Sequence, residues 1–282
     1  MIADLLNKGV TVLSEGKVIA STQNINTVET ICDDLSNLGI KSGDIILVHS
    51  SMSSIGWVCG AAQAVIMALQ KVISPSGTII MPSHTGSISD PVEWGNPPVP
   101  KEWIQLIYEN MPAFDVNFTQ SRGMGNIAEL FRTLPKVYRS NHPQVSFAAW
   151  GKLANDIISN HKLTPQFGME SPLGKMYNLN AKVLMLGVGY DSCTSFHLAE
   201  ALNDKMTLST MGAAIIENNK RIWKWFEDFD YNSDEDFEKL GNAFEETNNV
   251  VLGKIGSAEC KLFKMKIGVD FAKKWIQNNR FA

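Results

Sequence analysis

A strand followed by a glycine turn and a histidine is the part of this sequence best suited to chemistry. It occupies residues 182–200, KVLMLGVGYDSCTSFHLAE. The apolar run at 183–186 predicts a buried strand, and the glycines after it allow the chain to turn sharply at the strand's carboxyl end. Open α/β sheets bind their ligands at that end of the strands. We therefore expect His197 to lie at the functional edge of a sheet.

A short helix should carry His197 together with an acidic residue. Thr194 or Ser195 could cap a helix that begins near Phe196, which places His197 in the first turn. The positive end of the helix dipole disfavours imidazolium, so the ring would be neutral and able to accept a proton. Glu200 follows three residues later on the same helical face. The alternative is a helix-capping turn followed by a partly buried structural histidine.

Composition argues against several classes of protein. Hydrophobic residues make up 44% of the 282 residues and charged residues 19%, which is typical of a folded chain. The net charge of −4, without a polybasic run, argues against a nucleic-acid partner. No apolar segment is long enough for a signal peptide or a membrane span, so we expect a cytoplasmic protein with no membrane partner. We expect an N-terminal arm over residues 1–26, a single domain over residues 27–282, and a monomer or homodimer.

The four cysteines lie far apart and form no CxxC pair: Cys32, Cys59, Cys193 and Cys260. This spacing argues against a structural zinc site and favours a reducing compartment. Cys193 could serve as a covalent acyl carrier, although a reactive thiolate needs a specific activating environment.

A polar loop rich in hydroxyl groups follows the predicted strand 45–48. Residues 49–60, HSSMSSIGWVCG, connect that strand to a predicted helix at 61–73. Such a loop before a helix N-terminus can hold phosphate through backbone N–H groups, serine hydroxyls and the helix dipole. Neither a Walker A motif nor G-x-G-x-x-G is present, which argues against a nucleotide triphosphatase and a dinucleotide site. The alternative is an ordinary βα loop rich in turn formers.

Two further loops should reach the same edge of the sheet. The predicted strand 78–81 is followed by Ser83 and His84, and then by a long proline-rich region whose acidic and aromatic residues could form a wall for a cationic, ring-shaped ligand. These residues are Asp90, Glu93, Trp94 and Trp103. Residues 122–126, RGMGN, form a second glycine turn before a predicted helix, here with a guanidinium that could pair with phosphate.

The C-terminal part has a different texture. Residues 212–231 predict a hairpin with its turn at Asn218-Asn219, followed by an acidic helix at 233–246, a pair of strands and a final amphipathic helix. Asp228 and Asp230 end the second hairpin strand, where a carboxylate could meet a buried histidine or a cationic substrate. The whole pattern predicts a three-layer α/β/α fold with a central mixed, mostly parallel sheet and a C-terminal part that contains a β-hairpin.

Several segments together resemble the aminoglycoside 3-N-acetyltransferase family. The resemblance covers most of residues 27–230 and rests on these stretches: HSSMSSIGWVCGAAQAV (49–65), GTIIMPSHTGSISDPVEW (77–94), FTQSRGMGNIAELFR (118–132), RSNHPQVSFAAWG (139–151), FGMESPLGK (167–175) and VLMLGVGYDSCTSFHLAE (183–200). The pairing Met169-Glu170 departs from the family's expected pattern, and the tail after residue 231 matches only loosely.

The resemblance implies transfer of acetyl from acetyl-CoA to the 3-amino group of a deoxystreptamine antibiotic, without a metal. It implies that His197 is the general base and that Asp228 or Asp230 supports it, with Asp228 favoured as the group that hydrogen-bonds the ring. It also implies that the HSS loop and the RGMG turn contact CoA. The residues expected to bind CoA are His49, Ser50, Ser51, Ser53, Ser54, Ile55, Gly56, Trp57, Ser83, Arg122, Gly123, Met124 and Gly125.

The chemistry of the remaining residues fits this implication. A positioned imidazole could deprotonate the amine, with Glu200 or Asp191 as alternative orienting acids. Thr194, Ser195 or backbone N–H groups could stabilise the oxyanion. We expect the acidic residues at the expected acceptor site to converge on a negatively charged cleft: Asp90, Glu93, Asp191, Asp228 and Asp230, with Trp94 beside them.

Other functions stay open from the sequence. One is a metal-dependent amide hydrolase that uses His49, His84, His142 or His197 with Asp90 or Asp191, although these residues show no recognisable ligand spacing. A second is a CoA-binding module without catalysis. A third is an N-acetyltransferase that acts on another amino sugar or a polyamine.

Overall fold

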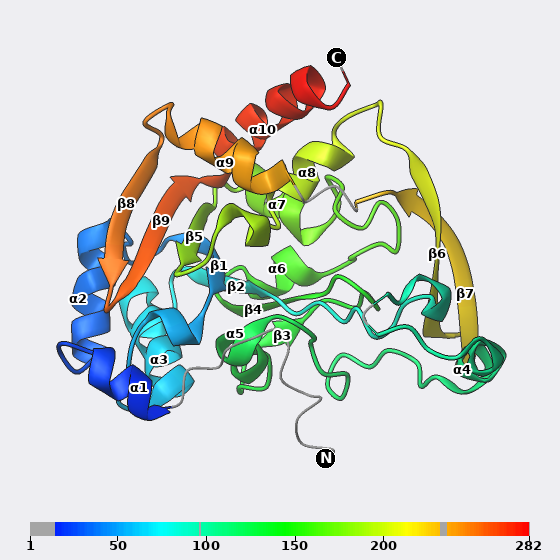
Figure 1. Cartoon of the computed structure of the whole chain (residues 1–282), viewed down its shortest axis with the longest axis horizontal. Coiled ribbons are helices and arrows are strands. Elements are labelled where there is room, and N and C mark those ends of the chain that lie inside the picture. Colours follow the sequence, from blue (N-terminus) through cyan, green and yellow to red (C-terminus); the bar gives the residue numbers. More distant parts are fainter. Residues whose placement is uncertain (1–14, 96, 232–235, 282) are drawn as a thin grey trace.

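The computed structural model describes residues 15–95, 97–231 and 236–281. Seven strands form one mixed sheet in the order β3-β4-β2-β1-β5-β9-β8 (Figure 1). These strands are β1 (Ile45–Ser50), β2 (Thr78–Pro82), β3 (Tyr138–Arg139), β4 (Phe147–Gly151), β5 (Lys182–Leu186), β8 (Val250–Ile255) and β9 (Ala258–Lys264). A separate two-stranded sheet consists of β6 (Leu208–Glu217) and β7 (Lys220–Phe229) and stands apart from the main body (Figure 1).

Ten α-helices and four short 3-10 turns connect the strands in the described part of the chain. The helices are α1 (Glu15–Ser21), α2 (Val28–Leu38), α3 (Ala61–Ile73), α4 (Ile104–Asn110), α5 (Gly125–Arg132), α6 (Ala154–Ile158), α7 (Pro172–Asn178), α8 (Phe196–Ala201), α9 (Phe237–Glu245) and α10 (Met265–Asn279). The 3-10 turns are η1 (Met52–Ser54), η2 (Pro91–Glu93), η3 (Lys101–Trp103) and η4 (Tyr190–Ser192).

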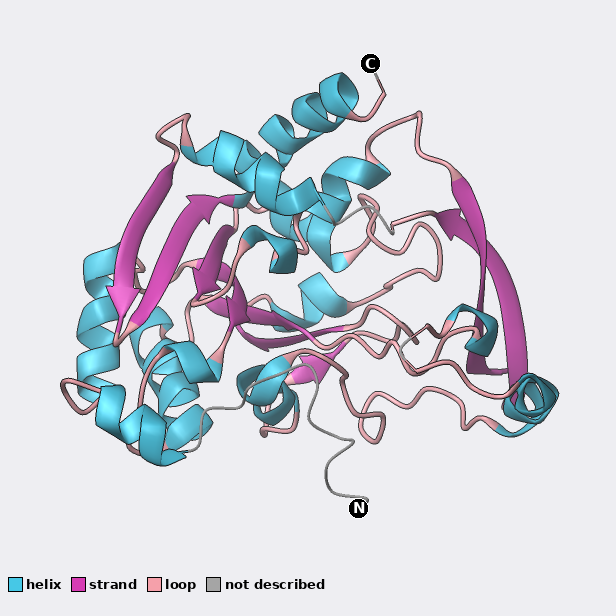
Figure 2. Ribbon diagram, in the orientation of Figure 1, coloured by secondary structure: helices cyan, strands magenta, loops and turns pink. Residues whose placement is uncertain are grey.

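Side chains alternate between the two faces of the sheet and create two cores. In β1, Ile46 and Val48 pack with α2, α3 and α5, whereas Leu47 between them packs with the opposite core. That second core includes Phe196 of α8 and Phe237 of α9. Helices therefore cover both faces (Figure 2), and the predicted three-layer α/β/α architecture is confirmed.

The sheet is mixed, but it is not mostly parallel as the sequence suggested. Strand β1 runs parallel to β2 and to β5, and the other four pairings in this sheet are antiparallel. An apolar run reveals that a strand is buried but not its direction, and β8–β9 is a hairpin that adds its strands to the end of the sheet. The parallel core remains the part that matters for the site, because the carboxyl ends of β2, β1 and β5 lie side by side.

Local sequence signals account for several elements. Thr27 and Thr30 form a capping box at the start of α2, and Gly39 ends that helix with φ of 104°. The hairpin turn uses Asn218 and Asn219, both with positive φ, as predicted. Ser195 occupies the cap position of α8, but its side chain does not cap the helix and instead contacts Cys193 Sγ at 3.2 Å.

The segment before α2 is partly described. Residues 15–26 pack on the main body, because Asn26 donates to the carbonyl oxygens of Ile55 and Trp57, and Trp57 Nε1 donates to Glu15. The remainder of the expected arm, residues 1–14, lies outside the described residues, as does the start of the acidic helix at 232–235.

Candidate active site

A cavity of about 700 Å³ opens at the carboxyl ends of the three parallel strands. It is lined by residues that follow β1, β2 and β5 and by the turn that begins α5. The lining includes His49, Ser50, Ser51, Ser53, His84, Gly123, Met124, Gly125, Asp191, Thr194 and His197. The structure therefore brings three separate sequence motifs together at one edge of the sheet, as predicted.

His197 is held by an acid on its own helix. Its Nδ1 lies 2.6 Å from Glu200 Oε2, one turn further along α8, and the Glu200 side chain is fully buried. A carboxylate accepts hydrogen bonds, so this contact fixes the proton of neutral His197 on Nδ1. Nε2 is then left with a lone pair, which is the arrangement a general base needs.

Aromatic rings hold the His197 ring in place. Phe167 stacks on it with centroids 4.8 Å apart and an interplanar angle of 11°, while Tyr231 meets it edge-on at 5.6 Å. Phe237 packs at 5.0 Å. These contacts restrict the ring to one orientation, so that only its protonation state need change during a reaction.

Two more histidines line the cavity beside His197. Burial, followed by the neighbouring His197, lowers the pKa of His49 to about 3, and burial likewise lowers the pKa of His84 to about 3. In each ring Nε2 is buried and has no hydrogen-bond partner among the described residues. Both rings are thus neutral near pH 7 and add no positive charge to the cavity wall.

Asp228 does not make the contact that we expected with His197. It is buried, and its carboxylate accepts hydrogen bonds from the backbone N–H groups of Gln166, at 2.7 Å, and Phe229, at 2.8 Å. Burial raises the pKa of Asp228 despite these bonds. The acid at the His197 ring is therefore Glu200. For Asp230, the structure records a backbone bond to the Thr207 carbonyl.

The HSS loop divides into two parts with different surroundings. Ser50, Ser51 and Ser53 line the cavity, and Ser51 N–H bonds the Leu186 carbonyl of β5. The second part, residues 54–57, lies away from the cavity: Ser54 Oγ donates to the Gly187 carbonyl, and Ile55 is fully buried in the core.

Gly56 and Trp57 also face the chain before α2 rather than the cavity. A Cβ on Gly56 would meet Thr22 and Ser257 side chains, and Trp57 N–H donates to Thr22 Oγ1. The part of the HSS loop that lines the cavity is accordingly shorter than the sequence suggested, because a run of small residues does not reveal where the chain turns away.

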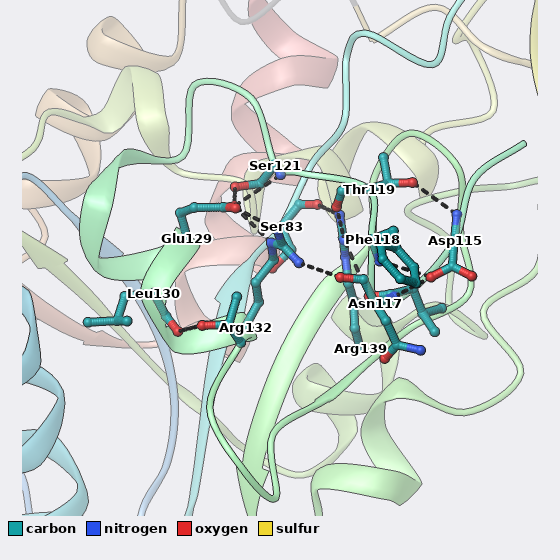
Figure 3. Close-up of polar contacts among 12 residues, drawn as sticks. Ser83, Asp115, Asn117, Phe118, Thr119, Ser121, Glu129, Leu130, Arg132 and Arg139 are labelled. Atoms are coloured by element: carbon teal, nitrogen blue, oxygen red, sulfur yellow. Dashed lines mark hydrogen bonds and ion pairs between the residues drawn. The ribbon is translucent and has the colours of Figure 1, made fainter. Parts of the chain in front are cut away.

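The RGMG turn is fixed by a buried arginine and an ion pair (Figure 3). Arg139 of β3 donates to the carbonyl oxygens of Thr119 and Ser83, at 2.5 and 2.7 Å. Glu129 of α5 accepts from Ser121 and from Arg132, which donates at 2.8 Å through Nε. These bonds fasten the 115–121 loop to β3 and α5 and so position Gly123–Gly125 at the cavity.

Arg122 faces a smaller, neighbouring pocket. Its backbone N–H donates to the His84 carbonyl, while its exposed side chain lines a space of about 370 Å³ with Trp94. Ser83 is buried, and its Oγ lacks a partner, but it does not line the main cavity in the described chain.

The acidic residues do not all converge on one cleft. Asp191 is exposed and lines the cavity. Asp90 caps η2 and accepts from Tyr108 Oη at 2.7 Å, Glu93 is exposed on η2, and Trp94 Nε1 donates to Ser89. Asp228 accepts hydrogen bonds from backbone N–H groups. Of the expected carboxylates whose surroundings the structure describes, Asp191 is therefore the one that lines the cavity.

Comparison with known proteins decides the family. A sequence model of the aminoglycoside 3-N-acetyltransferase family matches residues 47–277. The chain belongs to this family. Its members are acyltransferases, so the chain is an enzyme of that class, and the resemblance of the sequence motifs is confirmed.

Individual relatives agree with this assignment. The chain is 50% identical to the SPbeta prophage-derived aminoglycoside N(3')-acetyltransferase-like protein YokD of Bacillus subtilis (strain 168), over 93% of this chain and 97% of YokD. It is 31% identical to aminoglycoside N(3)-acetyltransferase IX of Micromonospora chalcea, over 89% and 93% of the two chains.

Solved structures of this family are also similar. The crystal structure of YokD from Bacillus subtilis has a TM-score of 0.93, with 94% of this chain and 98% of YokD covered. The structure of AAC-IIIb, binary with CoASH, has a TM-score of 0.80 at 27% identity, with 90% and 97% covered.

Other properties of this acyltransferase bear on the alternatives. No cluster of three or more His, Cys, Asp or Glu side chains suited to a metal ion occurs within residues 15–95, 97–231 and 236–281. Cys193 is fully buried in the core, and burial raises the pKa of its thiol to about 12, so it is poorly placed to carry an acyl group. Within those same described ranges, none of the helices combines the length and apolar character needed to cross a membrane.

Sequence reasoning missed several residues that support the site. Phe167 belongs to a segment that carried the family resemblance, but its stacking on His197 could not be read from the chain. Arg280 was not singled out at all, although it donates to the Glu200 carboxylate. Arg280 and Glu200 are 80 positions apart, and an isolated arginine carries no sequence signal for such a contact.

Proposed function

We propose that this acyltransferase moves an acetyl group from acetyl-CoA to the 3-amino group of a deoxystreptamine aminoglycoside, with His197 as the general base. The observation that carries the proposal is the His197–Glu200 pair at a cavity formed by the HSS and RGMG motifs. An amine protonated at neutral pH cannot attack a carbonyl carbon until it loses a proton. Neutral His197, with Nδ1–H bonded to Glu200, is suited to remove that proton through Nε2.

The residues around the cavity suit acetyl-CoA, which supplies an acetyl thioester when bound. The eight-residue helix α5 begins at Gly125 and directs its first backbone N–H groups toward the turn, where anions are favoured. Gly123 and Gly125 have positive φ, and nothing lies within 4 Å of a Cβ built on Gly123. Ser50, Ser51 and Ser53 add hydroxyl donors to the same cavity.

Other residues of this chain would orient the reacting groups. Thr194 lies at the cavity wall between η4 and His197 and could donate a hydrogen bond to a developing oxyanion. Asp191 at the cavity is the group that we propose for an ammonium group of the cationic acceptor. The bond from the acetyl carbon to the amine nitrogen forms as the bond from that carbon to the thioester sulfur breaks. His197 Nε2 takes the amine proton, and the CoA thiolate that leaves takes up a proton to become the free thiol.

A thiol-release assay with acetyl-CoA against a panel of aminoglycosides, other amino sugars and polyamines tests the proposal. We expect turnover with deoxystreptamine aminoglycosides and a loss of kcat of about 100-fold or more in His197→Ala, with little change in acetyl-CoA affinity. Near-normal kcat in a folded His197→Ala protein would reject His197 as the base. Turnover only with polyamines would instead favour the alternative acceptor class.

A further inference from the structure

We infer that Arg280 is a positioning residue for the His197–Glu200 pair, holding Glu200 as an oriented carboxylate and disfavouring the imidazolium form of His197. The inference rests on the proposed role of His197 and extends it to a residue at the far end of the chain. Arg280 follows α10, which packs beside α8 (Figure 1). It is not among the residues that line the cavity, and its direct contact with the pair is to Glu200.

The contacts of Arg280 form a continuous chain of charges that ends at His197. Its Nη1 donates to Glu200 Oε1, while the other carboxylate oxygen, Oε2, accepts from His197 Nδ1 at 2.6 Å. Its Nε and Nη2 donate to the two oxygens of Asp236, at 2.7 and 2.5 Å. The guanidinium is thus bidentate to Asp236 and uses its remaining side for Glu200.

Burial makes this contact consequential. The Glu200 side chain is fully buried, and a buried carboxylate remains ionised only when other groups compensate the loss of water. Burial also opposes the charge of Arg280, but the hydrogen bonds and charges of Asp236 and Glu200 outweigh it and raise the pKa of Arg280. The guanidinium is therefore a permanent positive charge one carboxylate away from the His197 ring.

Arg280 also supports the apolar wall of the base. Its guanidinium carbon lies 5.7 Å from the centre of the Phe237 ring, and Phe237 packs on the His197 ring. The backbone N–H of Arg280 bonds the Ile276 carbonyl of α10, so the arginine continues a rigid element. These contacts fix the position of the guanidinium relative to both partners.

Charged and titratable groups face His197 from every side of its pocket. Glu200 lies on its own helix, Tyr231 follows β7, and Arg280 and Asp236 lie behind Glu200. His49 lies near the end of β1, His84 comes shortly after β2, and Asp191 lies in the turn after β5. His49, His84 and Tyr231 are neutral near pH 7. Arg280 therefore supplies the positive charge in this group, and Glu200, Asp236 and Asp191 supply the negative charges.

This arrangement predicts that substitutions at Arg280 and at Asp236 shift the apparent pKa of the His197–Glu200 pair in opposite directions. Without the charge of Arg280, the positive potential at Glu200 and His197 is lower. The His197–Glu200 pair then binds a proton more easily, and its apparent pKa should rise. Removing the charge of Asp236 leaves Arg280 less neutralised, so the same apparent pKa should fall. A purely structural role would loosen the site in both variants and would not reverse the sign.

The test compares pH profiles of kcat/KM for wild type, Arg280→Gln, Arg280→Lys and Asp236→Asn with one aminoglycoside acceptor. The acceptor amine titrates identically in all four, so differences report the enzyme. We expect the acidic limb to move up by about 1 unit in Arg280→Gln, to move down in Asp236→Asn, and to return close to wild type in Arg280→Lys. Lys182→Gln, which breaks the partly buried ion pair of Lys182 with Asp44 at 2.6 Å, is the matched control for lost stability.

A second readout does not depend on activity. The chain has five histidines, so the ring carbon-bound protons of His197 can be assigned by comparison with His197→Gln and titrated by NMR in the ligand-free protein. The inference is supported if the His197 titration moves in the same directions as the pH profiles. It is overturned if Arg280→Gln titrates like wild type, or if Arg280→Gln and Asp236→Asn shift the same way.

These outcomes separate the inference from the proposed function. If His197→Ala retains turnover, the proposed function fails, yet the NMR titrations still decide whether Arg280 controls the protonation of His197. If His197 is essential and the Arg280→Gln profile is unchanged, only the inference fails. Should Arg280→Gln not fold, the downward shift expected for Asp236→Asn carries the test alone, and an unchanged or upward shift rejects it.

Discussion

Two buried carboxylates, Glu200 and Asp228, lie behind the cavity and hold different groups. Glu200 accepts from an imidazole and a guanidinium, so it is linked to the chemistry of the site. Asp228 accepts from backbone N–H groups at residues 166 and 229, so it fixes the segment that carries Phe167. The same side-chain type therefore serves orientation of the base in one case and loop structure in the other.

This difference predicts distinct consequences for two conservative substitutions. Glu200→Gln removes the charge that orients His197 and should lower kcat by about 10²-fold or more, because the ring loses its fixed tautomer. Asp228→Asn should keep kcat within several-fold while lowering the free energy of unfolding by about 1–3 kcal/mol, because buried N–H groups lose a charged acceptor. Steady-state kinetics and denaturant unfolding of both variants check this. The reverse pattern would restore Asp228 as the acid that serves the base.

The residues show how far sequence can reach at this scale. His197 and Glu200 fall three apart on one helix, and that spacing alone allowed Glu200 as an orienting acid. The preference for Asp228 came from family resemblance and from its place at a strand end. Which of two acids reaches an imidazole depends on how the hairpin strand and the 164–167 segment pack, and no local pattern encodes that packing.

At the scale of elements, the turn before α5 depends on a polar network rather than on apolar packing. Glu129 and Arg132 lie on α5, Arg139 lies on β3, and together they hold the 115–121 loop (Figure 3). The segment has few large apolar anchors; Phe118, for example, is 86% exposed. Its position should therefore respond to pH.

We expect this network to give the protein a defined acid sensitivity. Burial opposes ionisation of Glu129, but hydrogen bonds from Arg132 and Ser121 outweigh it and lower the pKa of Glu129 from 4.5 to about 2. A lowered folded-state pKa contributes stability that is present above pH 4.5 and is lost as the pH falls toward 2. Glu129→Gln should accordingly be less stable than wild type at pH 7, with a difference that shrinks as the pH falls through this window.

Thermal unfolding of wild type and Glu129→Gln between pH 7 and 3 measures this effect. Glu170→Gln is the matched control, because the Glu170–Lys162 pair is largely exposed and should contribute little at any pH. A difference for Glu129→Gln that stays constant with pH would show that its ionisation does not stabilise the loop. We also expect weaker acetyl-CoA binding in Glu129→Gln, since the network positions Gly123–Gly125.

Elements were predictable where the signal is local. The capping box at Thr27, the turn at Asn218-Asn219 and the apolar strands could each be read from a few neighbouring residues, and each is present. The direction of β4 and the addition of β9 beside β5 could not, because strand pairing is decided by long-range packing. The role of Arg139 was equally hidden, since its acceptors are carbonyl groups of distant segments.

At the scale of the whole molecule, the hairpin and the proline-rich segment form a second body of structure beside the sheet (Figure 1). Arg221 of β7 donates to the Tyr108 and Met111 carbonyl groups at α4, and Phe114 N–H bonds Ala214 of β6. This second body lies on the same side of the molecule as the long loops that extend from the sheet (Figure 2). The hairpin is thus joined to the segment that carries α4 by hydrogen bonds that composition could not reveal.

Charge at this scale bears on how the acceptor reaches the cavity. The chain carries a net charge of −4, and Asp191 is an exposed carboxylate in the cavity lining, next to Thr194 and His197. A polycationic amino sugar would be attracted by both the general charge and the local one. The two contributions can be separated, because Glu93 is also exposed but lies on η2 outside that lining.

Asp191→Asn and Glu93→Gln each remove one negative charge, so the long-range field of the molecule changes equally in both. If Asp191 meets an ammonium group of the acceptor, its substitution should raise the acceptor KM by about 5- to 10-fold and flatten the dependence of KM on salt. Glu93→Gln should change both quantities much less, because Glu93 is not among the residues that line the cavity and salt screens an exposed charge. Acceptor KM measured from 20 to 500 mM salt, ~20 to ~4 Å in Debye length, decides between them. Equal effects of the two variants would mean that only the net charge attracts the acceptor, and the ammonium contact assigned to Asp191 would be wrong.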